Sequence, residues 1–539
     1  LLSDPAEAGP VGEQVIVGDV TFTQNGNQWV ITASDGSIID YISFDVLANE
    51  SVQFIQPGEM ARVLNRINSA EPTQILGTLS SNGVLYFVNP SGVIFGQGAT
   101  VDVAGIVAAA GSISNADFLA GEDRFTGLGG AVENRGTITA GGRVAMLGDR
   151  VLNAGSISAN GGMIAMVAGD TVWLRTIDGR LAVRVDGKDI TGQHIPWAGS
   201  LTGTGTAVEN TGTIAAAGGQ VVLGAGDVAG LAVRNAGSIL AAGGEVTMAA
   251  TQGVVRNEGI VDVSGAAGGR VVLQGPAVEH LGTIRADGQS LRAGTIEIAG
   301  RQYTVLFPGS LLSARGTDGA ADGGTIVIDT IAGTTYFAEG ASIDVRGGAV
   351  GGDGGQVSLD GVGMVVRGSV SLDAGTGATP GTFTLLGGGV DVIIGMDGSD
   401  DAFLLDGNVT FDELPDSGTI QLSVNTLGNI ITGSILIQST GGIMLVSDLT
   451  LAAGTDLTLE AWNNIDILAA IAGANNLVAH ADFDNDGTGQ VRVEVPLSVG
   501  GSIELIGNAI QIDGGMLSAS GDIRLAGDTV LMSDTMISG

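Results

Sequence analysis

The seven residues VENRGTI at positions 132–138 recur along the chain and decide its fold. The further copies are VLNAGSI at 151–157, VENTGTI at 208–214, VRNAGSI at 233–239, VRNEGIV at 255–261 and VEHLGTI at 278–284, where His280 replaces the asparagine. In each copy apolar residues alternate with polar or small ones, which is the period of a β-strand with one face toward a core. The pattern predicts strands and disfavours helix.

A glycine-rich step and a second apolar strand follow each copy, as at Gly141-Gly142 and Gly218-Gly219. One repeat therefore takes roughly 20 to 25 residues, a length typical of solenoid repeats. A unit this short cannot bury its own apolar face, so successive units must stack, each strand pairing with its counterpart one coil later. We predict an all-β chain folded as a β-solenoid with parallel stacking.

The composition agrees with many short strands joined by tight turns. Glycine supplies 92 of the 539 residues, and aromatic residues make up 4% of the chain against 44% hydrophobic residues. A net charge of −36 argues against nucleic acid as a partner. No apolar run approaches the ~20 residues of a membrane-spanning helix, so we expect a chain that is not membrane-spanning. Cysteine is absent, which lets the chain stay unfolded in an oxidising periplasm.

Repeat regularity divides the chain into an N-terminal cap at 1–130, regular coils at 131–390 with an excursion at 171–205, and a less regular β-helix continuation at 391–539. The excursion breaks the repeat and carries Trp173, His194, Pro196 and Trp197. Large aromatic side chains, suited to sealing the end of a solenoid core, gather in the cap: Phe22, Trp29, Tyr41, Phe44, Phe54, Tyr86, Phe87 and Phe95.

Both ends of the chain carry an expectation of their own. Residues 1–10 lack the basic and apolar parts of a signal peptide, so we expect the numbering to start after processing. The strand pattern continues to the last residue, so we expect either a longer protein or another subunit stacked there.

Several motifs in the first two hundred residues resemble one family. They are VLNRI at 63–67, QILG at 74–77, SNGVLYFVNPSGVIFG at 81–96 and SNADF at 114–118. Their content and order resemble the filamentous-haemagglutinin-type secretion domain of two-partner-secretion exoproteins, over roughly residues 10 to 190. The resemblance implies a right-handed parallel β-helix, secreted through a dedicated outer-membrane barrel transporter that recognises this domain in the periplasm.

The family motifs fall on Asn65-Arg66 and on Asn89-Pro90-Ser91-Gly92, which we take as candidate secretion-motif residues. The second motif reads Asn-Pro-Ser-Gly here, where the family more often has Asn-Pro-Asn-Gly, and no clear Asn-Pro-Asn-Leu segment follows. This departure concerns the choice of partner more than the fold. Because Asn-Pro-Ser-Gly is also an ordinary turn, direct contact with the transporter and maintenance of the fold both remain open for these residues.

The search for chemistry favours no enzyme and no required cofactor. Parallel β-helices host polysaccharide-degrading enzymes, but most aspartates here lie beside glycine, as turn residues do. The three histidines, His194, His280 and His480, are far apart, and a solvent-facing or turn role is expected for them.

One acidic motif is a candidate metal site. Asp482, Asp484 and Asp486 alternate before Gly487, as at the start of many calcium loops, although Val493 at the twelfth position excludes an EF-hand. Calcium is therefore a possible ligand, weighed against a solvated acidic turn.

Two functions remain open for a protein of this kind outside the cell or on its surface. The chain forms part of an adhesin that binds a ligand on a host or neighbouring cell, or identical chains stack into an extracellular filament, a homopolymer. A polysaccharide-active enzyme is the third and weaker alternative.

Overall fold

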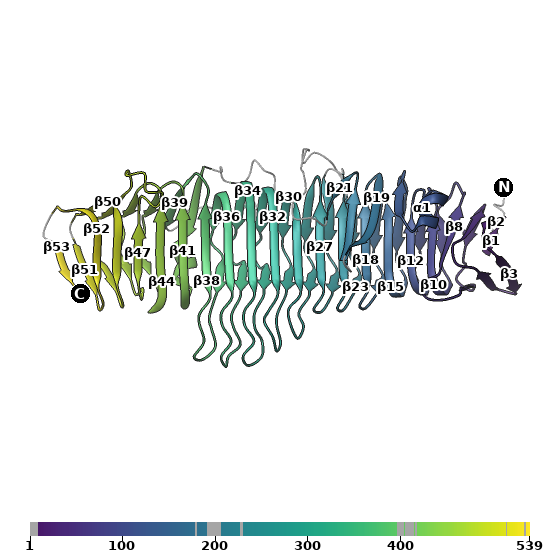
Figure 1. The fold of residues 1–539 in the computed structure, drawn as a ribbon, viewed down its shortest axis with the longest axis horizontal. Helices are drawn as coiled ribbons and strands as arrows, with labels where there is room; N and C mark the ends of the chain where they lie inside the picture. The colour runs from purple at the N-terminus through teal and green to yellow at the C-terminus, as the bar shows by residue number, and fades with distance from the viewer. Residues whose placement is uncertain are drawn as a thin grey trace. The chain divides into compact units, whose positions relative to one another are not determined.

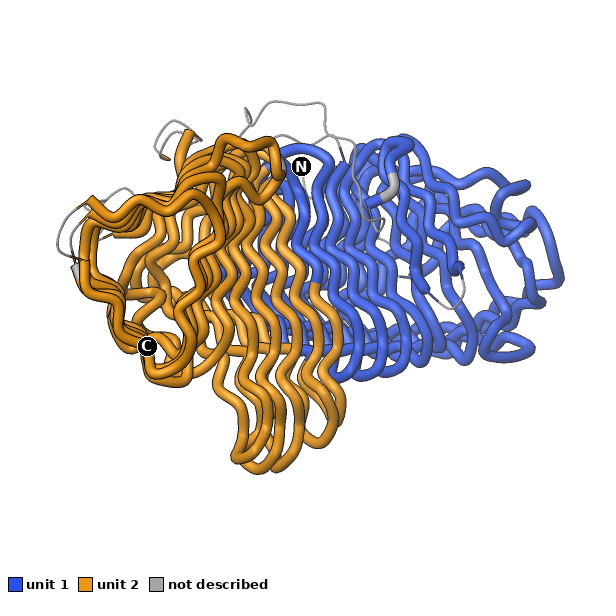
Figure 2. Tube along the Cα trace, turned by 60° about the vertical axis from the view of Figure 1, so that its left-hand side comes forward, with its two compact units in different colours: residues 1–263, 272–276 blue, residues 264–271, 277–539 orange. Residues whose placement is uncertain are grey.

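The computed structural model describes residues 9–177, 180–190, 206–226, 230–395, 404, 414, 418–513, 515–532 and 535–539. Strands dominate these residues, and the two helices, α1 (Asn115–Ala120) and α2 (Val424–Gly428), are short. The chain divides into two compact units (Figure 2): unit 1 holds residues 1–263 and 272–276, and unit 2 holds residues 264–271 and 277–539. Within the described residues no helix has the length and apolar character that a membrane span requires.

Unit 1 begins with antiparallel strands at the end marked N in Figure 1. These strands are β1 (Gly9–Val11), β2 (Gln14–Val17), β3 (Val20–Asn25), β4 (Gln28–Ala33), β5 (Ser37–Tyr41) and β6 (Ser43–Asp45). β1 pairs with β6, β2 with β5 and β3 with β4, all antiparallel. β4 and β5 then pair in parallel with β7 (Ser51–Ile55) and β8 (Arg62–Ile67). The expected β-rich cap is confirmed, and it presents a parallel edge to the first coil.

Aromatic side chains fill the first coils. The rings of Tyr41 and Phe44 lie 5.1 Å apart edge to face, and the rings of Phe44 and Phe87 lie 5.0 Å apart in the same geometry. Phe54 contacts both phenylalanine rings at 6.4 Å, and all four side chains are buried. Such edge-to-face pairs add to the free energy gained by burial, so these residues seal the core where the coils begin.

A column of aliphatic side chains runs through the coils of unit 1. It is carried by β7, β10 (Thr78–Val88), β12 (Thr100–Ala109), β15 (Thr137–Gly148), β17 (Ser156–Ser158), β23 (Thr213–Ala215), β26 (Ser238–Leu240) and β29 (Ile260–Asp262). In parallel register the column reads Val52, Leu79, Val101, Ile138, Ile157, Ile214, Ile239 and Val261, all fully buried. The predicted stacking of one repeat on the next is confirmed.

Unit 2 has its own column, on β31 (Thr283–Arg285), β33 (Leu311–Ser313), β35 (Ser342–Asp344) and β37 (Ser369–Ser371). Ile284, Leu312, Ile343 and Val370 stack in parallel register, so these coils take 28, 31 and 27 residues. The expected 20 to 25 residues per coil is therefore wrong here. The extra residues lie in extended arms at 286–294, 314–324, 345–355 and 372–381, which project from the coils (Figures 1 and 2).

The arms return to the coils at β32 (Thr295–Leu306), β34 (Thr325–Phe337), β36 (Gln356–Val366) and β38 (Thr382–Gly387). A glycine stands just before each return: Gly294, Gly324, Gly355 and Gly381. A Cβ on Gly324 would lie 2.1 Å from the carbonyl oxygen of Gly294, and a Cβ on Gly355 would lie 2.2 Å from that of Gly324. Real Cβ atoms do not approach backbone so closely, so only glycine lets successive arms stack at this spacing.

The less regular region after β38 continues as parallel coils, as expected. Its main ladder runs through β41 (Thr432–Ser439), β44 (Gly454–Ala461), β47 (Leu477–His480), β50 (Ile503–Ile512) and β52 (Ile523–Leu531). A second parallel sheet contains β43 (Leu449–Thr450), β46 (Ile471–Ala472), β49 (Leu497–Val499), β51 (Gly515–Ala519) and β53 (Thr535–Ser538).

The segment expected to leave the coils contains an antiparallel hairpin. β19 (Thr171–Ile177) pairs with β13 (Asp123–Thr126) on one side and with β20 (Arg180–Val185) on the other, and β21 (Lys188–Asp189) completes a four-stranded sheet. Its apolar face, which includes Phe125, Val172 and Val183, packs in one core cluster with coil residues such as Val107. His194, Pro196 and Trp197 lie outside the described residues, and the division into three segments remains a prediction.

Candidate functional site

Asn65 lies on β8 with its side chain fully buried. Tyr41 Oη donates a hydrogen bond to Asn65 Oδ1 at 3.2 Å, and Asn65 Nδ2 donates to the carbonyl oxygen of Tyr86 at 3.2 Å. Burial raises the pKa of the Tyr41 hydroxyl, which therefore stays protonated and keeps donating. Asn65 thus ties the cap strand β5 to the coil strand β10 through its two amide groups.

Arg66, the next residue, points to the other side of the strand and is half-buried. Its Nε donates to Asp40 Oδ1 at 2.8 Å, and its Nη1 donates to Asn115 Oδ1 at 2.8 Å. Arg66 therefore joins the cap strand β5 to the start of helix α1.

The Asn89-Pro90-Ser91-Gly92 motif forms a rigid turn between β10 and β11 (Gly92–Phe95). The buried Asn89 donates through Nδ2 to the Glu71 carbonyl oxygen at 3.0 Å and to Thr73 Oγ1 at 3.1 Å. Its Oδ1 accepts the backbone N–H of Ser91 at 2.9 Å. The turn is therefore held from inside by the asparagine.

The last two residues of the motif fix the turn to its neighbours. Ser91 Oγ donates to the Ser69 carbonyl oxygen at 2.9 Å. Gly92 adopts φ +123°, and a Cβ there would lie 2.7 Å from the Ala131 carbonyl oxygen, so the position requires glycine. Pro90 is exposed and Ser91 is half-buried, so these are the motif residues that face outward.

Asn65 and Asn89 are buried, and their hydrogen bonds give both side chains a structural role inside the fold. A partner could reach Pro90 and Ser91 without opening the coil, whereas it could not reach either asparagine. Contact of the motif with a transporter remains a prediction.

Sequence reasoning missed a buried polar network behind the motif strands. Tyr86 Oη donates to Asp123 Oδ1 at 2.8 Å, Arg143 Nη1 pairs with Asp123 Oδ2 at 2.5 Å, and Arg143 also contacts Tyr86 Oη. Burial is the largest influence on Tyr86 and raises its pKa strongly. The three residues lie 20 to 57 positions apart, so no local pattern announces them.

A second missed feature is an asparagine ladder inside unit 1. Asn134, Asn153, Asn210, Asn235 and Asn257 are all fully buried. Each of the first four donates through Nδ2 to Oδ1 of the next at 2.8 Å. The recurring asparagine two residues after an inward valine was the signal, because period-two alternation places both on the inner face.

The structure corrects the expectation for one histidine. His280 is fully buried, with Nε2 3.1 Å from the Leu311 carbonyl oxygen, and is therefore not solvent-facing. His480 lies half-buried on β47, where its ring meets the Phe483 ring edge to face at 5.1 Å. His194 lies outside the described residues.

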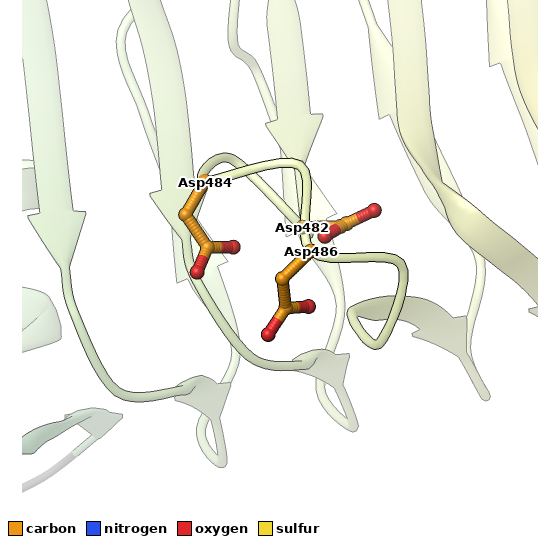
Figure 3. A group of neighbouring side chains, drawn as sticks. All are labelled: Asp482, Asp484 and Asp486. Atoms are coloured by element: carbon orange, nitrogen blue, oxygen red, sulfur yellow. The ribbon is translucent and has the colours of Figure 1, made fainter.

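The acidic loop after β47 brings its three aspartates together (Figure 3). One carboxylate oxygen from each of Asp482, Asp484 and Asp486 lies within 4.8 Å of the others. Internal hydrogen bonds shape the loop, since Asp482 Oδ1 accepts the Gly487 N–H at 2.9 Å and Asp486 Oδ1 accepts the Thr488 N–H at 2.9 Å. The donor set is hard oxygen, which suits calcium, although the same bonds also serve a solvated turn.

Comparisons with known proteins agree with the motif geometry. Residues 6–175 match the family model of the TPS secretion domain, the two-partner secretion domain. Two heme/hemopexin-binding proteins of Haemophilus influenzae are each 39% identical to the chain over 100 and 101 residues, which is 18% of this chain and 11% of either relative. The chain thus matches about a tenth of the length of these relatives.

The crystal structure of the HMW1 secretion domain from Haemophilus influenzae is similar in fold. The TM-score is 0.53 at 22% identity, over 77% of this chain and all of that chain. An antiparallel cap that leads into parallel coils, with the motif turn held inside the stack, is the architecture of a β-helix. Residues 6–175 match the TPS secretion domain, so the chain carries the secretion domain of two-partner-secretion exoproteins, which are secreted and lie outside the cell or on its surface. In this domain it is similar to the filamentous-haemagglutinin type.

Proposed function

We propose that an outer-membrane barrel transporter recognises residues 6–175 and exports the chain, and that the folded coils then act outside the cell as an adhesive or structural surface. The match to the TPS secretion domain carries this proposal. Where the motif turn has formed, its outward Pro90-Ser91 pair is the part that a transporter can touch, and the buried asparagines keep that turn in shape.

Self-stacking into a filament is the second candidate. In a filament, a second copy of this chain would add coils to the stack as each coil adds to the one before it. Electron microscopy of native material separates the two candidates, since separate hairs support the adhesin and uniform fibres support the filament.

We infer that the chain works without catalysis. The names of its relatives describe heme or hemopexin binding and secretion, not an enzymatic reaction. A turnover assay on extracellular polysaccharides tests the inference, and hydrolysis or elimination that is lost in a single Asp→Asn variant would contradict it.

We also propose that Asp482, Asp484 and Asp486 bind calcium weakly. The carboxylate separation above supports this, and three neighbouring carboxylates, two exposed and that of Asp482 half-buried, repel one another until a cation neutralises them. Calcium titration by isothermal calorimetry should show one site that disappears in an Asp484→Asn/Asp486→Asn variant, and an unchanged isotherm in that variant would exclude this loop.

Export is tested by secretion from the native host. A chain lacking residues 60–96 should not reach the medium, because both motif strands are removed. Asn89→Ala should reduce release by loosening the turn, whereas Pro90→Ala should fold normally and reduce release only through contact with the transporter. Normal secretion of the deletion chain would overturn the proposal.

A further inference from the structure

We propose that unit 1 carries a saccharide-binding cleft beside the hairpin β19–β20, which takes a neutral or weakly charged oligosaccharide. The inference rests on the proposed adhesive function and gives it a ligand class. The cleft has a volume of about 950 Å³ and is lined by Trp173, Arg124, Arg184, Glu122, Asp149 and Asp170, among others. This volume lies at the upper end of the range for small-molecule sites, about 300–1,000 Å³.

A preorganised tryptophan lies in the cleft. Trp173 is half-buried, and its Nε1 donates to Glu122 Oε2 at 3.1 Å, which fixes the indole edge. In the sheet register Trp173 lies directly between Arg124 on β13 and Arg184 on β20. The guanidinium carbons of Arg175 and Arg184 lie 4.8 Å and 6.0 Å from the indole centroid. An aromatic ring and two cationic donors therefore form one row across the sheet.

Several charged side chains in this cleft lack polar partners. Among the described residues, the side chains of Arg124, Arg184, Asp149 and Asp170 make no hydrogen bond or ion pair, and all four are exposed. Some other arginines of unit 1 are paired, as Arg66 is with Asp40 and Arg143 with Asp123, whereas Arg150 and Arg175 are described without a hydrogen bond or ion pair. Unsatisfied donors and acceptors of both signs therefore face one cavity.

This mixture fits a polyhydroxyl ligand better than a charged polymer. A polyanion would meet the carboxylates of the lining, which come from Asp117, Glu122, Asp149, Asp170 and Asp186, and a polycation would meet the guanidinium groups of Arg124 and Arg184. A sugar hydroxyl, by contrast, donates to a carboxylate and accepts from a guanidinium, so neighbouring hydroxyls can satisfy both kinds of group at once. The indole supplies the apolar surface that the C–H face of a pyranose needs.

A segment of the transporter is the competing occupant, because β13 and most of β19 lie within the matched secretion domain. A saccharide site requires that binding be a property of the folded, released protein. A transporter site requires that the same side chains control release. The two occupants therefore give opposite results in the test.

The test uses the full chain, purified from the medium, on a printed array of neutral tri- to pentasaccharides of hexoses and N-acetylhexosamines. Any oligosaccharide that binds is then titrated by isothermal calorimetry. Trp173→Phe and the pair Asp149→Asn/Asp170→Asn should each weaken binding tenfold or more with an unchanged circular dichroism spectrum. Trp462→Phe, at an exposed tryptophan of unit 2, is the matched control and should bind like the unchanged chain.

Three results would overturn the inference: no binding to the array, binding that the variants leave intact, or variants that the cells no longer release although the unchanged chain is released. Normal export without array binding removes the saccharide site alone and leaves the proposed function standing. Loss of export in the deletion experiment bears only on the proposed function.

Discussion

Each unit contains a column of buried aliphatic side chains, but the two units stabilise the turns beside that column in different ways. In unit 1 only four residues separate β17 from β18 (Met163–Ala168), β23 from β24 (Gln220–Ala225) and β26 from β27 (Glu245–Ala250). A buried ladder of asparagine side chains runs beside these coils. In unit 2 the corresponding connections are arms of 9 to 11 residues, aligned by glycines whose backbones touch.

The difference shows two ways to satisfy the polar groups at a solenoid corner. Side-chain amides bond to the next coil and also cap the carbonyl groups of a tight turn, as Asn210 does for Gly212. An extended arm instead places its own backbone against the next arm, for which the side chain must be absent. Unit 1 should therefore be sensitive to the loss of a side chain at its corners, and unit 2 to the gain of one.

The largest expected effect comes from a charged side chain placed in the aliphatic column of either unit. Ile138→Asp buries an unpaired carboxylate in unit 1 and should cost on the order of 4 kcal/mol or more. If coils fold in order from the cap, this variant should lose protease protection in both units, while Leu312→Asp should spare unit 1. Mass spectrometry of the protected fragments reads out the result. Thr139→Asp, on the exposed face of the same strand, is the control, and equal loss in both core variants would contradict ordered folding.

Adding one methyl group should distinguish the corners. Gly324→Ala places a Cβ 2.1 Å from a backbone oxygen and should destabilise unit 2 by on the order of 2–3 kcal/mol. Gly418→Ala meets nothing within 4 Å and should change little. Urea unfolding followed by hydrogen exchange in each unit measures the loss of stability in both variants. An equal loss in the two variants would show that the close stacking of the arms does not require glycine.

Removing one amide is the converse experiment. Asn210→Ala breaks the ladder on both sides and leaves buried polar groups without partners, so it should destabilise unit 1 by about 1–3 kcal/mol. Asn49→Ala, at an exposed position, is the matched control. The same urea titration measures the free energy of unfolding of both variants. Equal values would show that the asparagine ladder does not contribute to the stability of unit 1.

Acid should weaken both units slightly, through different ion pairs. Burial acts to raise the pKa of Glu258, but the hydrogen bond and charge of Arg234 outweigh it and lower this pKa. Asp344 in unit 2 behaves in the same way beside Arg346. A lowered folded-state pKa gives stability that is present above the ordinary carboxyl value, about 4, and lost as pH falls through the lowered one.

Thermal melts from pH 6 to pH 3 should therefore show a smaller acid-induced fall in melting temperature for Glu258→Gln than for the unchanged chain. Asp262→Asn, at a carboxyl outside this pair, is the comparison. A pH dependence that Glu258→Gln leaves unchanged would rule out the pair as a source of acid sensitivity.

The stacking of coils and the secretion domain could be predicted from the sequence because both depend on local patterns that are repeated or ordered along the chain. The period-two alternation around Val132 and Ile138 predicts the column directly. It also places Asn134 inward, yet an asparagine beside glycine reads first as a turn residue, so the ladder was missed. The arm glycines predict turns but not their contact, which depends on residues about 30 positions away. The cleft around Trp173 joins side chains from four segments and leaves no pattern in the sequence.

The asparagine ladder has a direction, and the direction bears on export. Asn134 donates to Asn153, Asn153 to Asn210, and so on, always toward the later coil. Each asparagine but the last therefore offers a side-chain N–H to the asparagine of the next coil, and Asn134, Asn210 and Asn257 also bond to the carbonyl group of their own turns. If the chain crosses the membrane in an extended form, we expect a completed coil outside to oppose its return. Each new asparagine of the ladder would then close one bond with the preceding coil and offer an N–H to the following one, so that folding favours outward movement of the chain.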